Sequence, residues 1–190
     1  MKLVIGMTGA TGAAIGVRVL SALRELEVET HLVISKWARA TIQMETPYSV
    51  QEVTALATRT YSEHDQAAAI SSGSFRVDGM IVVPCSMKTL AGIRSGYGDG
   101  LITRAADVTL KEQRKLVLVP REAPLNAIHL ENMLALTRAG ALMLPPMPAF
   151  YNNPQSVDDI INHTVSRILD QFGLDNDITH RWTGPRSTLA

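Results

Sequence analysis

The chain has 190 residues, enough for one sizeable α/β domain and short for two. Apolar residues make up 46% of it and charged residues 19%, a composition that supports a full hydrophobic core and argues against general disorder. The 18 basic and 18 acidic residues give a formal net charge of zero, so the chain lacks the basic excess typical of nucleic-acid-binding proteins.

The sequence carries no signal for export or membrane insertion. No apolar run is long enough to span a bilayer, and the first residues lead directly into an expected strand without the layout of a signal peptide. The single cysteine, Cys85, excludes a disulfide within the chain, and the five histidines show no metal-ligand spacing. We therefore expect a cytoplasmic protein without a metal and without a membrane or nucleic-acid partner.

Apolar runs alternate with helical patterns along the whole chain. A strand is expected over Leu3–Ile5, and a glycine-rich turn leads from it into a helix that ends near Leu26. The later expected elements are a strand over Thr30–Ser35, a helix over Ala38–Met44, a strand over Gly79–Pro84, helices over Ser86–Arg94 and Ile102–Gln113, a strand over Lys115–Pro120, a helix over Ile128–Ala139, a strand over Ala141–Leu144 and a helix over Val157–Phe172.

Continuous apolar strands separated by helices predict an α/β fold whose mostly parallel sheet is covered on both faces. We expect a single doubly wound, three-layered domain of the Rossmann-like or flavodoxin-like kind, over residues 1–175. The polar tail, residues 176–190, is expected to form a C-terminal arm. Ligands of doubly wound folds bind at the carboxyl ends of the strands.

The residues that follow the expected strands are mostly small, hydroxyl-bearing or charged. The strand ends read Met7–Gly12, Ser35–Lys36, Pro84–Thr89, Pro120–Glu122 and Pro145–Pro148, and four of the five end in such residues. Each group could serve only as a helix N-cap or a turn. Because parallel strands end at one edge of a sheet, the grouping favours a shared ligand.

The turn after the first strand raises the question of which phosphate it binds, because such turns usually expose backbone N–H groups to one. A dinucleotide site needs the spacing G-x-G-x-x-G and an acidic residue at the end of the second strand. Gly6, Gly9 and Gly12 are spaced by three, and the second strand ends in Ser35-Lys36. The pattern therefore favours a mononucleotide such as FMN over NAD.

Several blocks of sequence resemble one known family in their order and spacing. They are MTGATGA, ISKWA, PCSMKTLAGI, RAADVTLKE, LVLVPREAPL, IHLENML and PAFYNNPQSVDDI. On these motifs the chain is similar to the UbiX-type flavin prenyltransferases from about residue 2 to residue 183. It is most similar to the short branch associated with phenolic-acid and hydroxyarylic-acid decarboxylases.

The resemblance implies an enzyme that joins a dimethylallyl group from dimethylallyl monophosphate to N5 and C6 of reduced FMN. Its product, prenylated FMN, would serve a UbiD-type decarboxylase. Residues 1–175 would then be an FMN-binding flavoprotein domain that needs no metal. The family also implies a homododecamer with sites between subunits, and the apolar segment Met143–Phe150 likewise predicts a homo-oligomer.

Carried over by position, the resemblance implies three sets of site residues. The FMN-binding set is Gly9, Ala10, Thr11, Ser35, Ser86, Met87, Lys88, Thr89 and Arg121. The prenyl-phosphate set, drawn from more than one subunit, is Arg104, Lys111, Arg121, Tyr151 and Arg167. The set that handles protons and faces the allylic cation is Thr11, Glu45 and Glu122. Thr11 replaces a serine common in the family, and Met87 and Lys88 replace smaller residues.

Some of these residues also have plainer interpretations. Lys111 lies in a charge run typical of a solvated helix face, and Arg167 suits a surface ion pair. Glu122 suits an ion pair or a charge at a helix start, and Glu45 a carboxylate at a helix end. Cys85 has no histidine partner in the sequence, which favours a buried structural thiol.

Two alternatives to a prenyltransferase stay open at this point. One is an FMN-dependent oxidative decarboxylase of the same fold, which would use a histidine where this chain has Trp37–Met44. The other is a non-catalytic flavin carrier of a decarboxylase complex, which fold and FMN contacts alone do not distinguish from an enzyme. The prenyl-phosphate set favours an enzyme, because a carrier needs no second phosphate pocket.

Overall fold

The computed structural model describes residues 1–184 of the chain. The contacts divide it into two compact units, one over Met1–Pro146 and one that begins at Met147. Each unit is described by itself. The described residues contain no helix that is long and apolar enough to cross a membrane.

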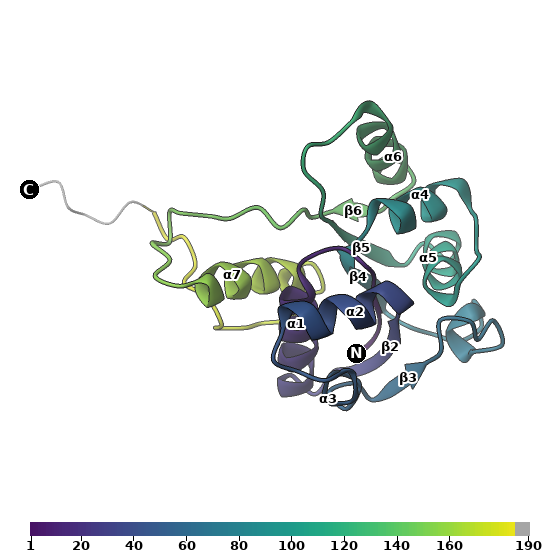
Figure 1. Ribbon diagram of the computed structural model, residues 1–190, viewed down its shortest axis with the longest axis horizontal. Helices are drawn as coiled ribbons and strands as arrows, with labels where there is room; N and C mark the ends of the chain where they lie inside the picture. Colours follow the sequence, from purple (N-terminus) through teal and green to yellow (C-terminus); the bar gives the residue numbers. More distant parts are fainter. Residues whose placement is uncertain (185–190) are drawn as a thin grey trace, which may run out of the picture. The chain divides into compact units, whose positions relative to one another are not determined.

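The first unit holds the sheet and all but one of the helices (Figure 1). Its elements in chain order are β1 (Lys2–Met7), α1 (Ala13–Glu25), β2 (Glu29–Ile34), α2 (Lys36–Glu45), α3 (Val50–Thr54), β3 (Arg59–Tyr61), the short 3₁₀ helix η1 (Ala69–Ser71), β4 (Gly79–Cys85), α4 (Met87–Ser95), α5 (Leu101–Lys111), β5 (Lys115–Pro120), α6 (Ala127–Arg138) and β6 (Leu142–Met143).

The sheet has six strands in the order β3-β2-β1-β4-β5-β6, and every neighbouring pair is parallel. The order reverses between β1 and β4, so the switch point at which doubly wound folds bind ligands lies between these two central strands. This confirms the predicted fold class. The sequence analysis missed β3 and α3, which are three and five residues long.

The central strands are buried on both faces, which explains their continuous apolar runs. On one face, alternate residues such as Val4, Met80 and Leu118 form a core with apolar side chains of α4, α5 and α6. On the other face, α1 contacts β2 and β4. The other expected elements are present, with ends that differ from the prediction by only a few residues.

Three glycines around the turn between β1 and α1 have separate packing reasons. A Cβ on Gly9 would lie 2.2 Å from Cβ of Trp37, so only glycine lets the start of α2 approach. Gly12 caps α1 with φ of 108°, in the left-handed region that favours glycine. A Cβ on Gly16 would lie 2.7 Å from both the carbonyl oxygen of Val83 and Cε of Met7. The glycine spacing therefore follows from packing and turn geometry.

The N-terminus of α1 is capped by a carboxylate from the end of α2. Gly12 has no side chain to cap the helix. Instead, Oε2 of Glu45 accepts hydrogen bonds from the N–H groups of Gly12 at 2.8 Å and Ala13 at 2.9 Å. A negative charge is favourable at a helix N-terminus. The sequence analysis expected this turn to expose backbone N–H groups to a phosphate, but these two N–H groups are bound by the chain's own Glu45.

Within residues 147–184, the second unit contains one helix, α7 (Val157–Asp170), which begins at a capping box. Ser156 Oγ accepts from the N–H of Asp159 at 3.1 Å, and Asp159 accepts in return from the N–H groups of Gln155 and Ser156. These hydrogen bonds, that from Gln155 first, lower the pKa of Asp159.

The C-terminal arm was predicted over residues 176–190, and 185–190 lie outside the described residues. Within residues 176–184, Arg181 pairs with Asp170 at the end of α7. The predicted domain boundary after residue 175 stays a prediction.

We expect Gly16→Ala to destabilise the protein by about 1–3 kcal/mol, because the new methyl group would meet the backbone carbonyl of Val83. Thermal unfolding measures the effect. Gly98→Ala is the matched control, since a Cβ there meets nothing closer than 3.9 Å. Equal melting temperatures for the two variants would contradict the close packing of α1 on the sheet.

We expect Glu45→Ala to cost about 1 kcal/mol of stability, as the loss of a helix cap does. Both hydrogen bonds end on one oxygen, so Glu45→Gln keeps an acceptor and loses only the charge, worth about 0.3–1 kcal/mol at a helix N-terminus. Denaturant unfolding of the two variants beside the parent gives the comparison. An alanine variant as stable as the parent would show that Glu45 does not cap α1.

Candidate functional site

A cavity of about 800 Å³ lies within the first unit, at the carboxyl edge of the sheet. Its lining includes Gly9 after β1, Ser35 after β2 and Ser86 after β4. The lining also includes residues at the starts of α2 and α5, residues along α4, loop residues such as Tyr97, and Asn132 of α6. The cavity therefore opens beside the switch point, where the fold class predicts a ligand.

Two helix N-termini with serine caps contribute to this cavity. Ser35 Oγ accepts from the N–H of Ala38 at 3.2 Å and caps α2, and Ser86 Oγ accepts from the N–H of Thr89 at 3.2 Å and caps α4. The Ser86 hydroxyl donates to Thr89 Oγ1 at 3.1 Å. The Ser35 and Thr89 hydroxyls therefore keep a proton each for an anion, beside two helix dipoles. The predicted capping role and the predicted ligand-binding role are compatible.

Thr8 holds the two central loops together. Its hydroxyl donates to the carbonyl oxygen of Pro84 at 2.8 Å and accepts from the N–H of Ser86 at 2.8 Å. The N–H of Thr8 also donates to the Pro84 carbonyl, at 3.2 Å. Thr8 is almost fully buried, so these bonds are shielded from water. They link the end of β1 to the start of α4 and thereby position Ser86.

One lining residue that sequence reasoning missed is Glu63, just after β3. Its carboxylate accepts from the N–H of Lys36 at 2.7 Å, and its carbonyl oxygen accepts from the N–H of Leu101 at 2.8 Å. Glu63 thus joins the starts of α2 and α5. The lining also includes Tyr97 and Trp37, two largely exposed rings suited to an aromatic ligand. A charge after an edge strand was the available signal for Glu63, but that strand was not predicted.

The structure brings part of the predicted FMN-binding set together. Gly9, Ser35, Ser86, Lys88 and Thr89 line the cavity.

The other members of that set lie outside the lining. Met87 packs partly against the core, and Ala10 and Thr11 belong to the turn before α1. Arg121 is exposed, and its N–H donates to the carbonyl oxygen of Cys85 at 3.2 Å. That bond places Arg121 at the same edge of the sheet, one strand away from Ser86.

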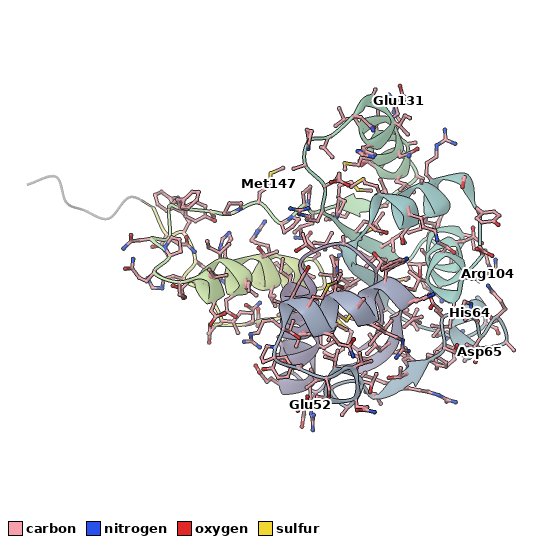
Figure 2. All side chains as sticks on the ribbon, in the orientation of Figure 1. Glu52, His64, Asp65, Arg104, Glu131 and Met147 are labelled. Carbon is pink, nitrogen blue, oxygen red and sulfur yellow. The ribbon has the colours of Figure 1, made fainter. Side chains whose placement is uncertain are left out.

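Two predicted prenyl-phosphate residues of the first unit lie on α5, away from the cavity lining. Arg104 Nε donates to the carbonyl oxygen of Ser71 at 3.1 Å, and its Nη1 pairs with Asp107 at 2.7 Å. Lys111 pairs with its neighbour Glu112, as the plainer interpretation of a solvated helix face expected. Figure 2 labels Arg104 at the edge of this unit, together with His64 and Asp65.

The other two predicted prenyl-phosphate residues lie in the second unit. Tyr151 Oη is 3.2 Å from Nε2 of His163, and Nη1 of Arg167 is 2.9 Å from Oδ2 of Asp170. Arg167 therefore does make the ion pair that its plainer interpretation expected.

The predicted proton-handling residues are all exposed to solvent in the single chain. Thr11 lies in the turn before α1, next to the Gly12 amide that Glu45 caps. Glu122 accepts from the N–H of Ala123 at 3.0 Å, so it behaves partly as a turn-forming charge. Its carboxylate keeps accepting positions for a proton from a ligand.

The buried thiol of Cys85 and the arrangement of potential metal ligands are the remaining features of the site region. Cys85 is fully buried, and burial raises the pKa of its thiol to about 12, as a structural thiol requires. Among residues 1–184, no group of three or more His, Cys, Asp or Glu side chains is arranged to hold a metal ion.

Comparison with known proteins agrees with this geometry. The chain matches the family model named Flavoprotein over residues 1–169. A probable UbiX-like flavin prenyltransferase from Escherichia coli O157:H7 is 69% identical over 185 residues, which cover 97% of this chain and 94% of the relative.

Two solved structures are also similar. A dodecameric FMN-dependent UbiX-like decarboxylase from Escherichia coli O157:H7 is 69% identical with a TM-score of 0.96, covering 97% of this chain and 100% of its own. AnUbiX (PadA1), in complex with FMN and dimethylallyl pyrophosphate, is 59% identical with a TM-score of 0.96, covering 97% and 98%. The chain therefore belongs to the Flavoprotein family, in its UbiX-like flavin prenyltransferase branch.

Proposed function

We propose that this protein is a flavin prenyltransferase that joins a dimethylallyl group from dimethylallyl monophosphate to N5 and C6 of reduced FMN. The observation that carries the proposal is the meeting of two serine-capped helix N-termini at a cavity beside the switch point. The volume of about 800 Å³ is within the range of small-molecule sites. A relative that is 59% identical was solved with FMN and dimethylallyl pyrophosphate, which supports FMN together with a dimethylallyl donor that carries phosphate.

The residues at the cavity fit the phosphate of FMN. Ser35 and Thr89 offer uncharged hydroxyl donors, Ser86 orients the Thr89 hydroxyl by donating to it, and the α2 and α4 N-termini add partial positive charge. Lys88 adds a full charge at the lining. Gly9, Ala10, Thr11, Met87 and Arg121 complete the proposed FMN-binding set.

The second phosphate, that of the donor, requires stronger cations, because it must be bound and must also leave. We assign it to Arg104, Lys111, Arg121, Tyr151 and Arg167, contributed by more than one subunit. Arginine offers bidentate contacts to phosphate oxygens, and lysine offers a point charge. The same contacts stabilise the charge that develops on the departing phosphate, so they lower the barrier as well as bind.

FMN supplies the nucleophilic ring atoms, and the chain supplies the proton acceptors. In the proposal, Glu122 accepts the proton that C6 loses on alkylation. Thr11 and Glu45 face the reacting atoms beside it. The capping bonds of Glu45 hold it next to the backbone of Thr11, which supports a joint role for the pair.

Assembly with further copies follows from α6. Among its residues, Ile128, Leu130 and Leu134 are at least half exposed, and Leu136 is buried. In Figure 2 Glu131 marks this helix at the outer edge of the unit. An exposed apolar helix face of this kind marks an interaction surface. The relative solved as a dodecamer suggests that other copies of the chain bury it. We propose a cytoplasmic homo-oligomer, with a dodecamer as the expected size and a UbiD-type decarboxylase as recipient of the product.

Anaerobic incubation with reduced FMN and dimethylallyl monophosphate, followed by mass spectrometry of the flavin, tests the function. We expect the mass of prenylated FMN only when both are present. One 69% identical relative is named a decarboxylase, so the control replaces the prenyl donor with a phenolic or thiol-bearing carboxylic acid. Release of carbon dioxide in that control, with no flavin adduct in the main reaction, would favour an FMN-dependent decarboxylase. Bound FMN without either reaction would favour a carrier.

We expect Glu122→Gln to slow formation of the closed prenylated flavin by about 10²–10⁴, the usual range for loss of a general base. FMN affinity should be unchanged, since the amide keeps the shape of the side chain. Absorbance spectra distinguish the closed product over time, and calorimetry gives the FMN affinity. Glu27→Gln is the control, because this exposed carboxylate precedes β2 at the opposite edge of the sheet. A parent-like rate for Glu122→Gln would assign the base to another group.

A further inference from the structure

Tyr151 lies between two aromatic side chains of the second unit. Its ring makes edge contacts with His163 and with Trp182, each at 5.6 Å between centroids. Its hydroxyl is 3.2 Å from Nε2 of His163. The ring is about half exposed. These three contacts fix the direction of the phenol group, although much of the ring is open to solvent.

His163 is the buried member of this group. Burial lowers the pKa of its imidazole, and the nearby positive charge of Arg167 lowers it further, while Asp170 opposes the shift. The ring is therefore neutral at neutral pH and carries one N–H. Within residues 1–184, Nδ1 is buried without a hydrogen-bond partner. The Tyr151 hydroxyl, at Nε2, therefore decides which ring nitrogen gains by carrying the imidazole proton.

Arg167 lies four residues after His163 on α7, so the two residues share one face of the helix. One guanidinium nitrogen of Arg167 pairs with Asp170 at 2.9 Å. Asp170 also pairs with both terminal nitrogens of Arg181, at 3.1 and 2.7 Å. The carboxylate is therefore shared, and Arg167 keeps further N–H donors for an anion. A phenol donor and a guanidinium donor thus flank His163.

We propose that His163 is a positioning residue for the donor phosphate, holding the Tyr151 hydroxyl so that its proton is directed to a phosphate oxygen beside Arg167. The inference rests on the proposed function. The imidazole donates its Nε2–H to the phenol oxygen, which leaves the phenol proton for the anion. In the other tautomer the proton is on Nδ1, so the phenol would have to donate its own proton to Nε2. The buried Nδ1–H would then have no hydrogen-bond acceptor among residues 1–184.

A double-mutant cycle tests the proposal through the Michaelis constant for dimethylallyl monophosphate. We expect Tyr151→Phe and His163→Leu each to raise this constant by about tenfold, the usual effect of one lost hydrogen bond to a charged group. The double variant should be no worse than Tyr151→Phe alone, because His163 acts only through the phenol. His163→Gln should come within a few-fold of the parent, since its amide N–H can replace Nε2–H. FMN affinity should be unchanged throughout.

Additive effects in the double variant, or a parent-like constant for His163→Leu, would overturn the proposal. A His163→Gln variant as impaired as His163→Leu would also overturn it, because the loss would then be one of packing. Melting temperature and FMN affinity verify that each variant is folded. If His163→Leu does not fold, the Michaelis constants of His163→Gln and Tyr151→Phe still test the proposal.

A binding measurement separates this inference from the proposed function. The same variants are titrated by calorimetry with dimethylallyl monophosphate and with inorganic phosphate. The double-mutant cycle is then built from ligand affinities, which do not depend on catalysis. If the parent makes no prenylated FMN, the proposed function fails, while an equal loss of phosphate affinity in the single and double variants still supports the role of His163. Unchanged phosphate affinity in His163→Leu overturns that role whether or not the enzyme is active.

Discussion

The hydroxyl group of Thr8 joins the two halves of the sheet at the point where a ligand can enter. The register pairs of β1 and β4 end at Gly6 and Val82, and two residues further on the N–H of Thr8 still donates to the carbonyl oxygen of Pro84. The Thr8 hydroxyl donates to the same carbonyl oxygen and accepts from the N–H of Ser86 in a buried position. Without this hydroxyl the N–H of Ser86 would lose its hydrogen-bond partner. The Thr8 side chain therefore ties the start of α4, and with it the Ser86 cap, to the end of β1.

The two phosphate-binding sets of the proposal differ in character. At the cavity, hydroxyl groups and helix N-termini lie beside cationic residues such as Lys88, which suits a phosphate that must stay in place. The set assigned to the other phosphate consists mainly of arginine and lysine side chains, on α5, after β5 and on α7. This difference matches the proposed chemistry, since one phosphate only anchors a ligand and the other must depart with growing charge.

Sequence reasoning recovered the fold because its evidence is local and repeated. An apolar run such as Lys115–Pro120 predicts a strand, and a cap such as Ser86 predicts the start of a helix, from a few neighbouring residues. The edge strand β3 was missed because it has only three residues, two of them exposed, which is too short for a pattern.

The site was recovered less fully than the fold. Glu63 was missed together with β3, since its role depends on that strand. The cap that Glu45 places on α1 joins residues more than thirty positions apart, and His163 works through Tyr151 across a turn. Such pairings depend on tertiary contacts, and no local spacing reveals them.

The cap on α1 also limits how this scaffold can be redesigned. In dinucleotide-binding folds the pyrophosphate lies on the N-terminus of the first helix. Here a carboxylate of the chain already fills that position, with two hydrogen bonds. Correcting the glycine spacing would therefore not create an NAD site, because an incoming phosphate would meet a fixed negative charge. Any such conversion would have to begin by removing Glu45 and stabilising the start of α1 in another way.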